Sequence, residues 1–258
     1  MPRLRINKMK RQIVLAAQAA CEGHVPSAFS ILDILWVLYD QVMKCDASKS
    51  NTLEFDRFVL SKGHASLALY AVLAEKNYFS ADHLNTFCKY DSMLGGHPDS
   101  NKIEAVEAST GSLGHGLPIA VGISLGSKIS KNENRIFCLI GDGECNEGTV
   151  WESALLAAQH KLSNLCCIVD YNHSTDRAIE LGDLAGKFVS FGWEVLAIDG
   201  HDHDAIYRAL NYRPKNQPLV IIADTIKGYG VKRMENEPAW HHRSPNSEEL
   251  ASIIEELA

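Results

Sequence analysis

Arg135-Ile-Phe-Cys-Leu-Ile-Gly-Asp-Gly143 is an apolar run that ends in a carboxylate flanked by two glycines. A second apolar run, Leu165-Cys-Cys-Ile-Val-Asp-Tyr171, is followed directly by Asn172. Residues 148–161, between the two runs, have the pattern of a helix. A strand–helix–strand unit predicts two parallel strands whose carboxyl ends lie at one edge of a sheet. We therefore expect Asp142 and Asn172 to lie close together at that edge.

The pair Asp142 and Asn172 has the chemistry of a magnesium site. Mg²⁺ prefers oxygen ligands in octahedral array and keeps substrate phosphates in its shell. Asp142 would bring charge, Asn172 a neutral carbonyl oxygen, and the backbone carbonyl of Ser174 could add a third protein ligand. Gly141 and Gly143 would let the backbone approach a diphosphate closely, and the dipole of the following helix favours an anion there. Asp-Gly alone is usually a turn, so the interpretation depends on Asn172.

The rest of the chain continues the alternation of strands and helices. Strands are expected at 57–60, 135–140, 165–171, 193–198 and 219–224, and helices at 5–22, 30–43, 65–76, from about 116 to 129, 148–161, 203–211 and at the acidic end 247–258. Strands that are apolar throughout predict a parallel sheet covered on both faces. We expect a doubly wound α/β fold with a mostly parallel sheet. One domain spanning residues 1–258 is favoured over two small ones.

Composition narrows the class of protein. Of 258 residues, 46% are hydrophobic, which is enough for a large core, and the formal net charge of −7 argues against a nucleic-acid partner. The apolar runs are too short to cross a bilayer, so no membrane partner is expected. The seven cysteines are odd in number and lack paired metal spacing, which indicates a reduced, cytoplasmic protein. Adjacent Cys166 and Cys167 should point to opposite faces of a strand.

The first 21 residues leave two interpretations open. A basic start followed by Ile13-Val-Leu-Ala-Ala-Gln-Ala-Ala-Cys21 has the outline of a signal peptide. Gln12 and Gln18 interrupt the apolar stretch, and this favours a basic amphipathic first helix.

Several histidines lie beside glycines in expected loops. His24, His64 and His97 each follow a glycine, and together they suggest a polar pocket in which imidazoles move protons near neutral pH. A single loop histidine more often faces solvent or caps a turn. His201 and His203 have the spacing of a metal cluster, but the aspartates beside them suit an N-cap for the next helix better.

The order of these motifs resembles the amino-terminal half of the transketolases, a family of thiamine diphosphate enzymes. Gly-Asp-Gly followed by Asn is shared by thiamine diphosphate enzymes in general, whereas the histidine loops point to transketolase. The similar stretches, from about residue 10 to 245, are Arg57-Phe-Val-Leu-Ser-Lys-Gly-His64, Gly96-His-Pro98, Thr110-Gly-Ser-Leu-Gly114, Gly141-Asp-Gly143, Glu147-Gly148, Trp151-Glu152, Asp170-Tyr-Asn172, Phe191-Gly-Trp193, Asp199-Gly-His-Asp202 and Thr225-Ile-Lys-Gly228.

The resemblance implies thiamine diphosphate and Mg²⁺ as cofactors and gives roles to individual positions. Asp142, Asn172 and the carbonyl of Ser174 would bind Mg²⁺, with Gly141 and Gly143 against the diphosphate. The segment Gly111, Ser112 and Leu113 would contact the aminopyrimidine. The residues given substrate or coupling roles are His24, His64 and His97 in the substrate channel, His241 at substrate or diphosphate, and Glu147, with Glu152, between the active sites of a dimer.

The resemblance also implies a partner. In full-length transketolases a further domain binds the pyrimidine and supplies the glutamate that protonates it. The family also exists as two polypeptides, and this chain is similar to the amino-terminal one. We therefore expect a thiamine diphosphate-binding subunit that is active only with a carboxyl-terminal transketolase-like subunit, in an α2β2 assembly. The reaction implied moves a two-carbon ketol unit from a ketose or ketose phosphate to an aldehyde.

Two departures from the family pattern affect this interpretation. Ser112 and His115 stand where the family commonly has Gly-Pro-Leu-Gly-Gln-Gly, and His173-Ser-Thr-Asp-Arg-Ala178 replaces the usual aliphatic residue and Asp-Gly turn. They suggest a specialised donor or acceptor rather than the usual pentose phosphates. Three alternatives stay open: a split 2-oxo acid decarboxylase, a protein like deoxyxylulose-phosphate synthase, or a non-catalytic partner subunit.

Overall fold

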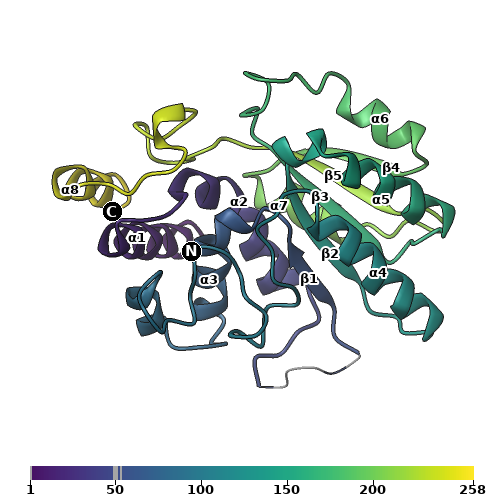
Figure 1. Ribbon diagram of the computed structural model, residues 1–258, viewed down its shortest axis with the longest axis horizontal. Coiled ribbons are helices and arrows are strands. Elements are labelled where there is room, and N and C mark those ends of the chain that lie inside the picture. The colour runs from purple at the N-terminus through teal and green to yellow at the C-terminus, as the bar shows by residue number, and fades with distance from the viewer. Residues whose placement is uncertain (1, 49–51, 53) are drawn as a thin grey trace.

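A five-stranded parallel sheet forms the centre of the computed structural model, which describes residues 2–48, 52 and 54–258. The strands β1 (Arg57–Leu60), β2 (Ile136–Gly141), β3 (Leu165–Tyr171), β5 (Leu219–Asp224) and β4 (Glu194–Asp199) follow one another across the sheet in this order (Figure 1). All neighbouring pairs in this sheet are parallel, and Gly141 is in register with Asp170. The predicted doubly wound α/β fold is confirmed.

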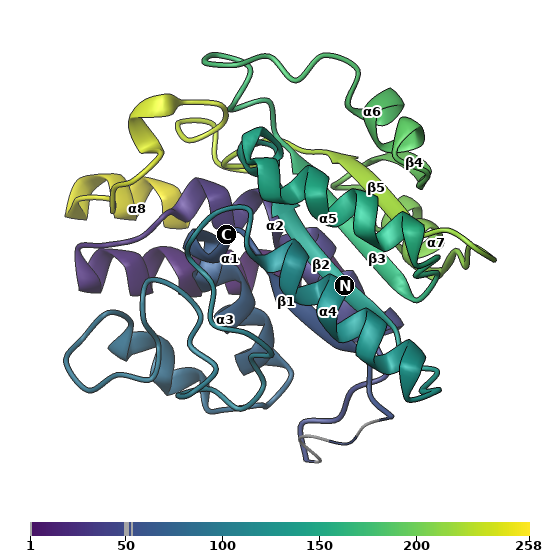
Figure 2. The same cartoon turned by 45° about the vertical axis from the view of Figure 1, so that its right-hand side comes forward.

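Helices cover both faces of the sheet (Figures 1 and 2). The core on one face contains residues from α1, α2, α3 and α7, and the core on the other face contains residues from α4, α5 and α6. Cys166 belongs to the first core and Cys167 to the second, as expected for neighbours on a strand. The helices are α1 (Pro2–Ala20), α2 (Val25–Val37), α3 (Ser66–Glu75), α4 (Gly116–Ile129), α5 (Gly148–Gln159), α6 (Leu184–Ser190), α7 (His203–Asn211) and α8 (Ser247–Glu256).

The two ends of the chain pack together. Helix α8 lies beside α1 at the left of Figure 1, and Arg11 Nη1 donates to the carbonyl of Leu257 at 2.6 Å. Residues 5–20 therefore belong to a helix packed in the core, in agreement with the amphipathic-helix interpretation. Asn246 begins α8 with a capping box: its side chain accepts from Glu249 N, and the Glu249 side chain accepts from Asn246 N.

Helix α2 begins five residues before the predicted start at residue 30. Pro26 occupies its first turn, where a missing N–H costs nothing, and the helix continues into a π-helical turn at Leu38–Val42. By length and composition Val25–Val42 could cross a membrane, but 83% of it is buried inside the fold. This segment is longer than the short apolar runs expected from the sequence, since the helix continues through Ser27, Ser30 and Asp33. Two of them, Ser30 and Asp33, hydrogen-bond to residues of other segments.

Asp170, at the end of β3, is fully buried and joins several segments of the chain. Its carboxylate forms an ion pair with Lys62, which follows β1, and accepts from Ser30 Oγ of α2 at 2.8 Å and from Thr225 Oγ1 after β5 at 2.5 Å. Burial alone would raise the pKa of Asp170, but the charge of Lys62 together with hydrogen bonds from Lys62, Thr225 and Ser30 keeps it below the ordinary value. The strand ends are therefore fixed by one buried charge.

We predict that Lys62→Met lowers the free energy of unfolding by about 3–5 kcal/mol, because it leaves a buried carboxylate without its counter-charge. Urea denaturation followed by circular dichroism measures this change.

Lys8→Met is the matched control for this prediction. Lys8 pairs with Glu75 at 2.7 Å, but its side chain is 52% exposed. The loss of such a pair should cost about 0–1 kcal/mol. Equal effects of the two substitutions would contradict the importance of the Lys62–Asp170 pair.

Candidate functional site

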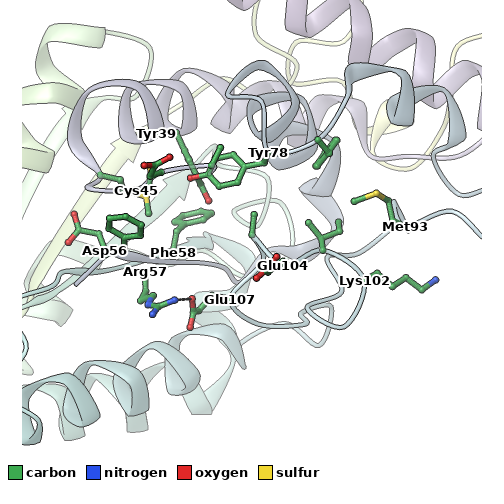
Figure 3. A pocket seen from close by; sticks show the side chains of 17 residues that line it. Tyr39, Cys45, Asp56, Arg57, Phe58, Tyr78, Met93, Lys102, Glu104 and Glu107 are labelled. Carbon is green, nitrogen blue, oxygen red and sulfur yellow. Dashed lines mark hydrogen bonds and ion pairs between the residues drawn. The ribbon is translucent and has the colours of Figure 1, made fainter. Parts of the chain in front are cut away.

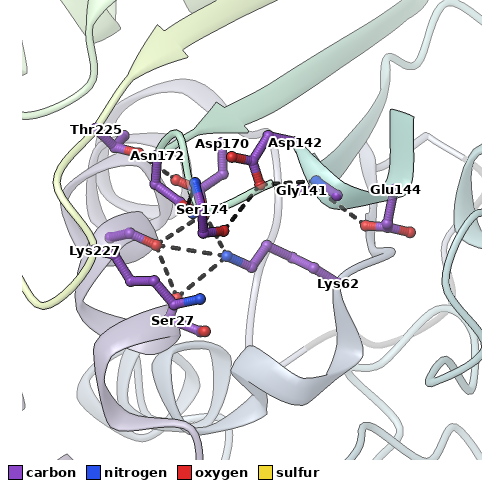
Figure 4. Close-up of polar contacts among 12 residues, drawn as sticks. Ser27, Lys62, Gly141, Asp142, Glu144, Asp170, Asn172, Ser174, Thr225 and Lys227 are labelled. Carbon is purple, nitrogen blue, oxygen red and sulfur yellow. Dashed lines mark hydrogen bonds and ion pairs between the residues drawn. The ribbon is translucent and has the colours of Figure 1, made fainter. Parts of the chain in front are cut away.

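The carboxyl ends of β2 and β3 bring Asp142 and Asn172 together, as predicted (Figure 4). Both side chains are buried, and Ser174 bridges them. Ser174 Oγ donates to Asp142 Oδ1 at 3.3 Å, and Ser174 N donates to Asn172 Oδ1 at 3.2 Å. The backbone N–H of Asp142 donates to the carbonyl of Asp170 at 3.1 Å, which fixes the turn after β2 beside β3.

The oxygen atoms of this pair suit a hard cation. Asp142 Oδ2 is buried and has no hydrogen-bond partner among the residues that the structure describes. Burial, with Asp170 nearby, raises the pKa of Asp142, because these two effects exceed the stabilisation of its charged form by Lys62 and nearby backbone N–H groups. Asn172 Nδ2 donates to Asp170 Oδ2 at 2.8 Å, and its carbonyl oxygen, which already accepts from Ser174 N, keeps a second lone pair for a ligand. A divalent cation would satisfy both oxygens.

The space beside Asp142 suits a diphosphate. A Cβ atom placed on Gly143 would meet no atom within 4 Å, and Gly148 at the start of α5 is equally open. The twelve-residue helix α5 begins there, so its free N–H groups face the same space. The residues present therefore fit a cation bound to a diphosphate.

Two lysines that sequence analysis left without a role lie at this site. Lys62 is buried against Asp170, and Lys227 Nζ lies 2.8 Å from His241 Nδ1. Burial, with Lys62 nearby, lowers the pKa of Lys227 to about 8. Both lysines occur in the quoted motifs, Ser61-Lys-Gly-His64 and Thr225-Ile-Lys-Gly228. A positively charged residue in a motif expected near a diphosphate was the signal that could have identified them.

Glu144 is a third residue at this site whose role was not predicted from the sequence. Its side chain is buried and accepts from the backbone N–H groups of Gly114 and Gly141, each at 2.8 Å, while Ser61 Oγ donates to it at 2.5 Å. Burial raises its pKa. Glu144 thus holds the segment around residues 111–114 against the strand ends, and nothing in the local sequence distinguishes it from a loop acid.

Three of the predicted histidines meet in one cluster. The ring centroids of His24 and His64 lie 5.0 Å apart, and His241 lies 5.3 Å from His24. His24 Nδ1 donates to the carbonyl of His241 at 2.8 Å, and His242 stacks on His24. Burial lowers the pKa of His24 to about 4, and burial with Lys62 lowers that of His64 to about 2. These imidazoles are neutral near pH 7.

His97 lies apart from these rings. It is exposed and packs on Gly111, where an added Cβ would come within 3.1 Å of its ring. His97 therefore borders the segment Gly111, Ser112 and Leu113 instead of joining the other histidines. Ser112 and Leu113 are both exposed, and His115 contacts Ser112 Oγ at 3.2 Å.

Four other residues singled out from the sequence, Glu147, His201, Asp202 and His203, are placed as follows. Glu147 is the exposed residue before α5, and its Cβ closely approaches Gly114. Asp202 caps α7, as expected, by accepting from the N–H groups of residues 204 and 205. No group of three or more metal-ligating His, Cys, Asp or Glu side chains occurs among the described residues, so His201 and His203 form no such metal cluster.

A cavity of about 470 Å³ opens beside Asn172 and is lined by Ser174, Lys227 and His241 together with the unusual loop after Asn172. In that loop His173 adopts a left-handed φ of 60° and contacts Asp176 and Asp224 at 3.0 and 3.1 Å. The loop is therefore held to the end of β5.

A second cavity, of about 310 Å³, lies at the amino-terminal end of β1, where Arg57 and Phe58 line it (Figure 3). Tyr39, Phe58 and Tyr78 line it, and Arg57 pairs there with Glu107 at 3.1 Å. It shares no residue with the cavity beside Asn172.

Comparisons with known proteins agree with this geometry. Residues 3–257 match the family model described as "Transketolase, thiamine diphosphate binding domain". One of the subunits of the apulose-4-phosphate transketolase of Actinobacillus succinogenes is 39% identical over 96% of this chain and 92% of its own length. The 6-deoxy-6-sulfo-D-fructose transketolase subunit SqwG of a Clostridium species is 38% identical over 91% of this chain and 88% of its own length.

Solved transketolases share the fold. Transketolase from Campylobacter jejuni superposes on all of this chain with a TM-score of 0.91 and 30% identity, and that from Leishmania mexicana with 0.92 and 26%. The chain spans only 43% and 41% of those two proteins. From the family match and the site at the strand ends, we conclude that this chain belongs to the transketolase family as its thiamine diphosphate-binding domain.

Proposed function

We propose that the chain is the thiamine diphosphate- and Mg²⁺-binding subunit of a two-component transketolase. The observation that carries the proposal is the buried, unpartnered Oδ2 of Asp142 beside the carbonyl oxygen of Asn172, which Ser174 N orients. Asp142, Asn172 and the carbonyl of Ser174 would hold Mg²⁺, with Gly141 and Gly143 against the diphosphate. When bound, thiamine diphosphate supplies the carbanion and the electron sink for breaking and forming carbon–carbon bonds.

The histidine cluster supports a polyhydroxylated substrate. Neutral His24, His64 and His241 can both donate and accept hydrogen bonds, which suits the hydroxyl groups of a ketose. His97, which packs on Gly111, would also contact the substrate. Lys227 is placed to balance the negative charge of the diphosphate, since it lines the same cavity as Asn172.

The partner proposal rests on how similar proteins are named. This chain spans about two fifths of the solved transketolases, and two similar proteins are named as subunits. We propose a second subunit that carries the pyrimidine-binding domain and its glutamate, arranged as α2β2. Gly111, Ser112 and Leu113 would meet the aminopyrimidine, and exposed Glu147 would face the neighbouring protomer.

Substrate choice is the finer part of the proposal. The loop at 173–178 departs from the family and lines the cavity beside Asn172. Relatives at 38–39% identity are named for apulose-4-phosphate and for a sulfonated fructose. These facts support a specialised sugar as donor or acceptor. The seven free cysteines support a reducing compartment such as the cytoplasm.

Reconstitution tests this function. The chain, thiamine diphosphate and Mg²⁺ should transfer ketol units only after addition of the neighbouring gene's product, if that product resembles the remainder of a transketolase. Ketose phosphates should be consumed and pyruvate should not. Activity of the chain alone, or with pyruvate, would contradict the proposal; preference for xylulose 5-phosphate and ribose 5-phosphate would contradict only the specialised donor.

Asp142→Ala should abolish Mg²⁺-dependent binding of thiamine diphosphate, because it removes the charged ligand. Calorimetric titration with the partner present measures the affinity. Glu180 is an exposed acid just beyond the loop at 173–178. Glu180→Gln is therefore the control and should bind thiamine diphosphate normally. Normal binding by Asp142→Ala would refute the metal site.

His97→Ala should lower kcat by about 10²-fold, the usual size of a lost proton-transfer or orienting group. Thiamine diphosphate affinity should change little, because His97 is not among the residues proposed to hold Mg²⁺ or the diphosphate. His83→Ala, an exposed histidine elsewhere, should leave both values unchanged. An equal loss of turnover and cofactor affinity would show that His97 acts on the cofactor site instead.

A further inference from the structure

A chain of hydrogen bonds outside the cofactor site connects helix α2 to the segment that follows β5. Asp33 Oδ2 contacts His201 Nδ1 at 3.0 Å, and the backbone N–H of Ile226 donates to His201 Nε2 at 3.0 Å. The side chains of Asp33 and His201 are each only 6% exposed. Tyr229 stacks on the imidazole of His201 with ring centroids 3.6 Å apart, which fixes the plane of that ring.

The contacts of His201 define its tautomer. A backbone N–H can only donate, so Nε2 must be the unprotonated acceptor. Nδ1 therefore carries the proton and donates to the Asp33 carboxylate, and the imidazole is neutral. Burial opposes ionisation of Asp33, but hydrogen bonds from His201 and His203 hold its pKa at about 2. Asp33 thus keeps its negative charge. It thereby favours the His201 tautomer whose Nε2 accepts the hydrogen bond from the backbone N–H of Ile226.

Ile226 lies between two residues of the cofactor site. Thr225 donates to Asp170 at 2.5 Å, and Lys227 contacts His241 at 2.8 Å. Ile226 and Lys227 both line the cavity beside Asn172. A displacement of the Ile226 peptide would therefore move the Lys227 side chain relative to the proposed diphosphate.

We propose that Asp33 and His201 are positioning residues that hold the Ile226 peptide and thereby set Lys227 for the cofactor diphosphate. This inference rests on the proposed function, because it assigns Lys227 to the cofactor. Neither residue faces the cavity beside Asn172.

The chain offers a matched control for this role. His203 Nε2 contacts the other oxygen of the same carboxylate, Asp33 Oδ1, at 2.8 Å. No hydrogen bond connects His203 to residues 225–227 in the part of the chain that the structure describes. Loss of His203 therefore weakens the surroundings of Asp33 without removing the contact to Ile226.

Two substitutions separate the hydrogen bonds of His201. His201→Asn keeps a donor near the Nδ1 position but loses the acceptor for Ile226, whereas His201→Gln keeps an acceptor near the Nε2 position but loses the donor to Asp33. Both lose the stacking on Tyr229. We expect His201→Asn to weaken thiamine diphosphate binding about tenfold in calorimetry with Mg²⁺ and partner, the scale of one lost hydrogen bond. His201→Gln should weaken it clearly less.

The control and a second measurement make the test decisive. His203→Asn should lower the midpoint of urea denaturation and leave cofactor affinity unchanged. Hydrogen exchange of wild-type Ile226 should show a protected amide, and His201→Asn should speed that exchange. Equal affinities of the two His201 variants, a loss of affinity in His203→Asn equal to that in His201→Asn, or an unprotected Ile226 amide would overturn the inference. A wild-type chain that binds no thiamine diphosphate would instead overturn the proposed function, and the exchange of Ile226 would still decide the contact with His201.

Discussion

The buried ion pair between Asp170 and Lys62 is the interaction on which the rest of the site depends. A carboxylate with no solvent contact is tolerated only if its charge and lone pairs are satisfied. Asp170 meets that requirement with donors from Lys62, Ser30, Thr225 and Asn172. These donors come from four places in the chain, so satisfying one charge brings the ends of β1, β3 and β5 and the start of α2 together. The carboxamide of Asn172 is oriented by the same charge.

The elements that supply structure and those that supply chemistry differ in how far the sequence could predict them. Strands β1, β2, β3 and β5, and the meeting of Asp142 with Asn172, follow from local apolar patterns and from the topology of parallel sheets. The roles of Glu144 and Lys227 do not, because each depends on partners that are distant in sequence. Glu144 accepts hydrogen bonds from the N–H of Gly114 and the hydroxyl of Ser61, and no local sequence pattern reveals these contacts.

Two further differences have local physical causes. Helix α6 was missed because its seven residues are too short for a clear helical period, and only the cap by Asp183 marks its start. The histidines with glycine before them were expected in one pocket; His24 and His64 are in ring contact, whereas the contact that His97 makes is with Gly111. Similar local sequence does not determine where a loop packs. The functional roles of these three histidines are proposals.

Helix α2 contributes one residue to each of two hydrogen-bonded networks, one around Asp170 and one around His201. Ser30 and Asp33 are three residues apart and therefore lie on one face of the helix. Ser30 contacts Asp170, which holds Thr225, while Asp33 contacts His201, which holds Ile226. Consecutive residues after β5 are thus fixed from a single rigid helix that is otherwise buried and apolar. The contacts that hold Thr225 and Ile226, the residues directly before Lys227, are therefore made within this chain.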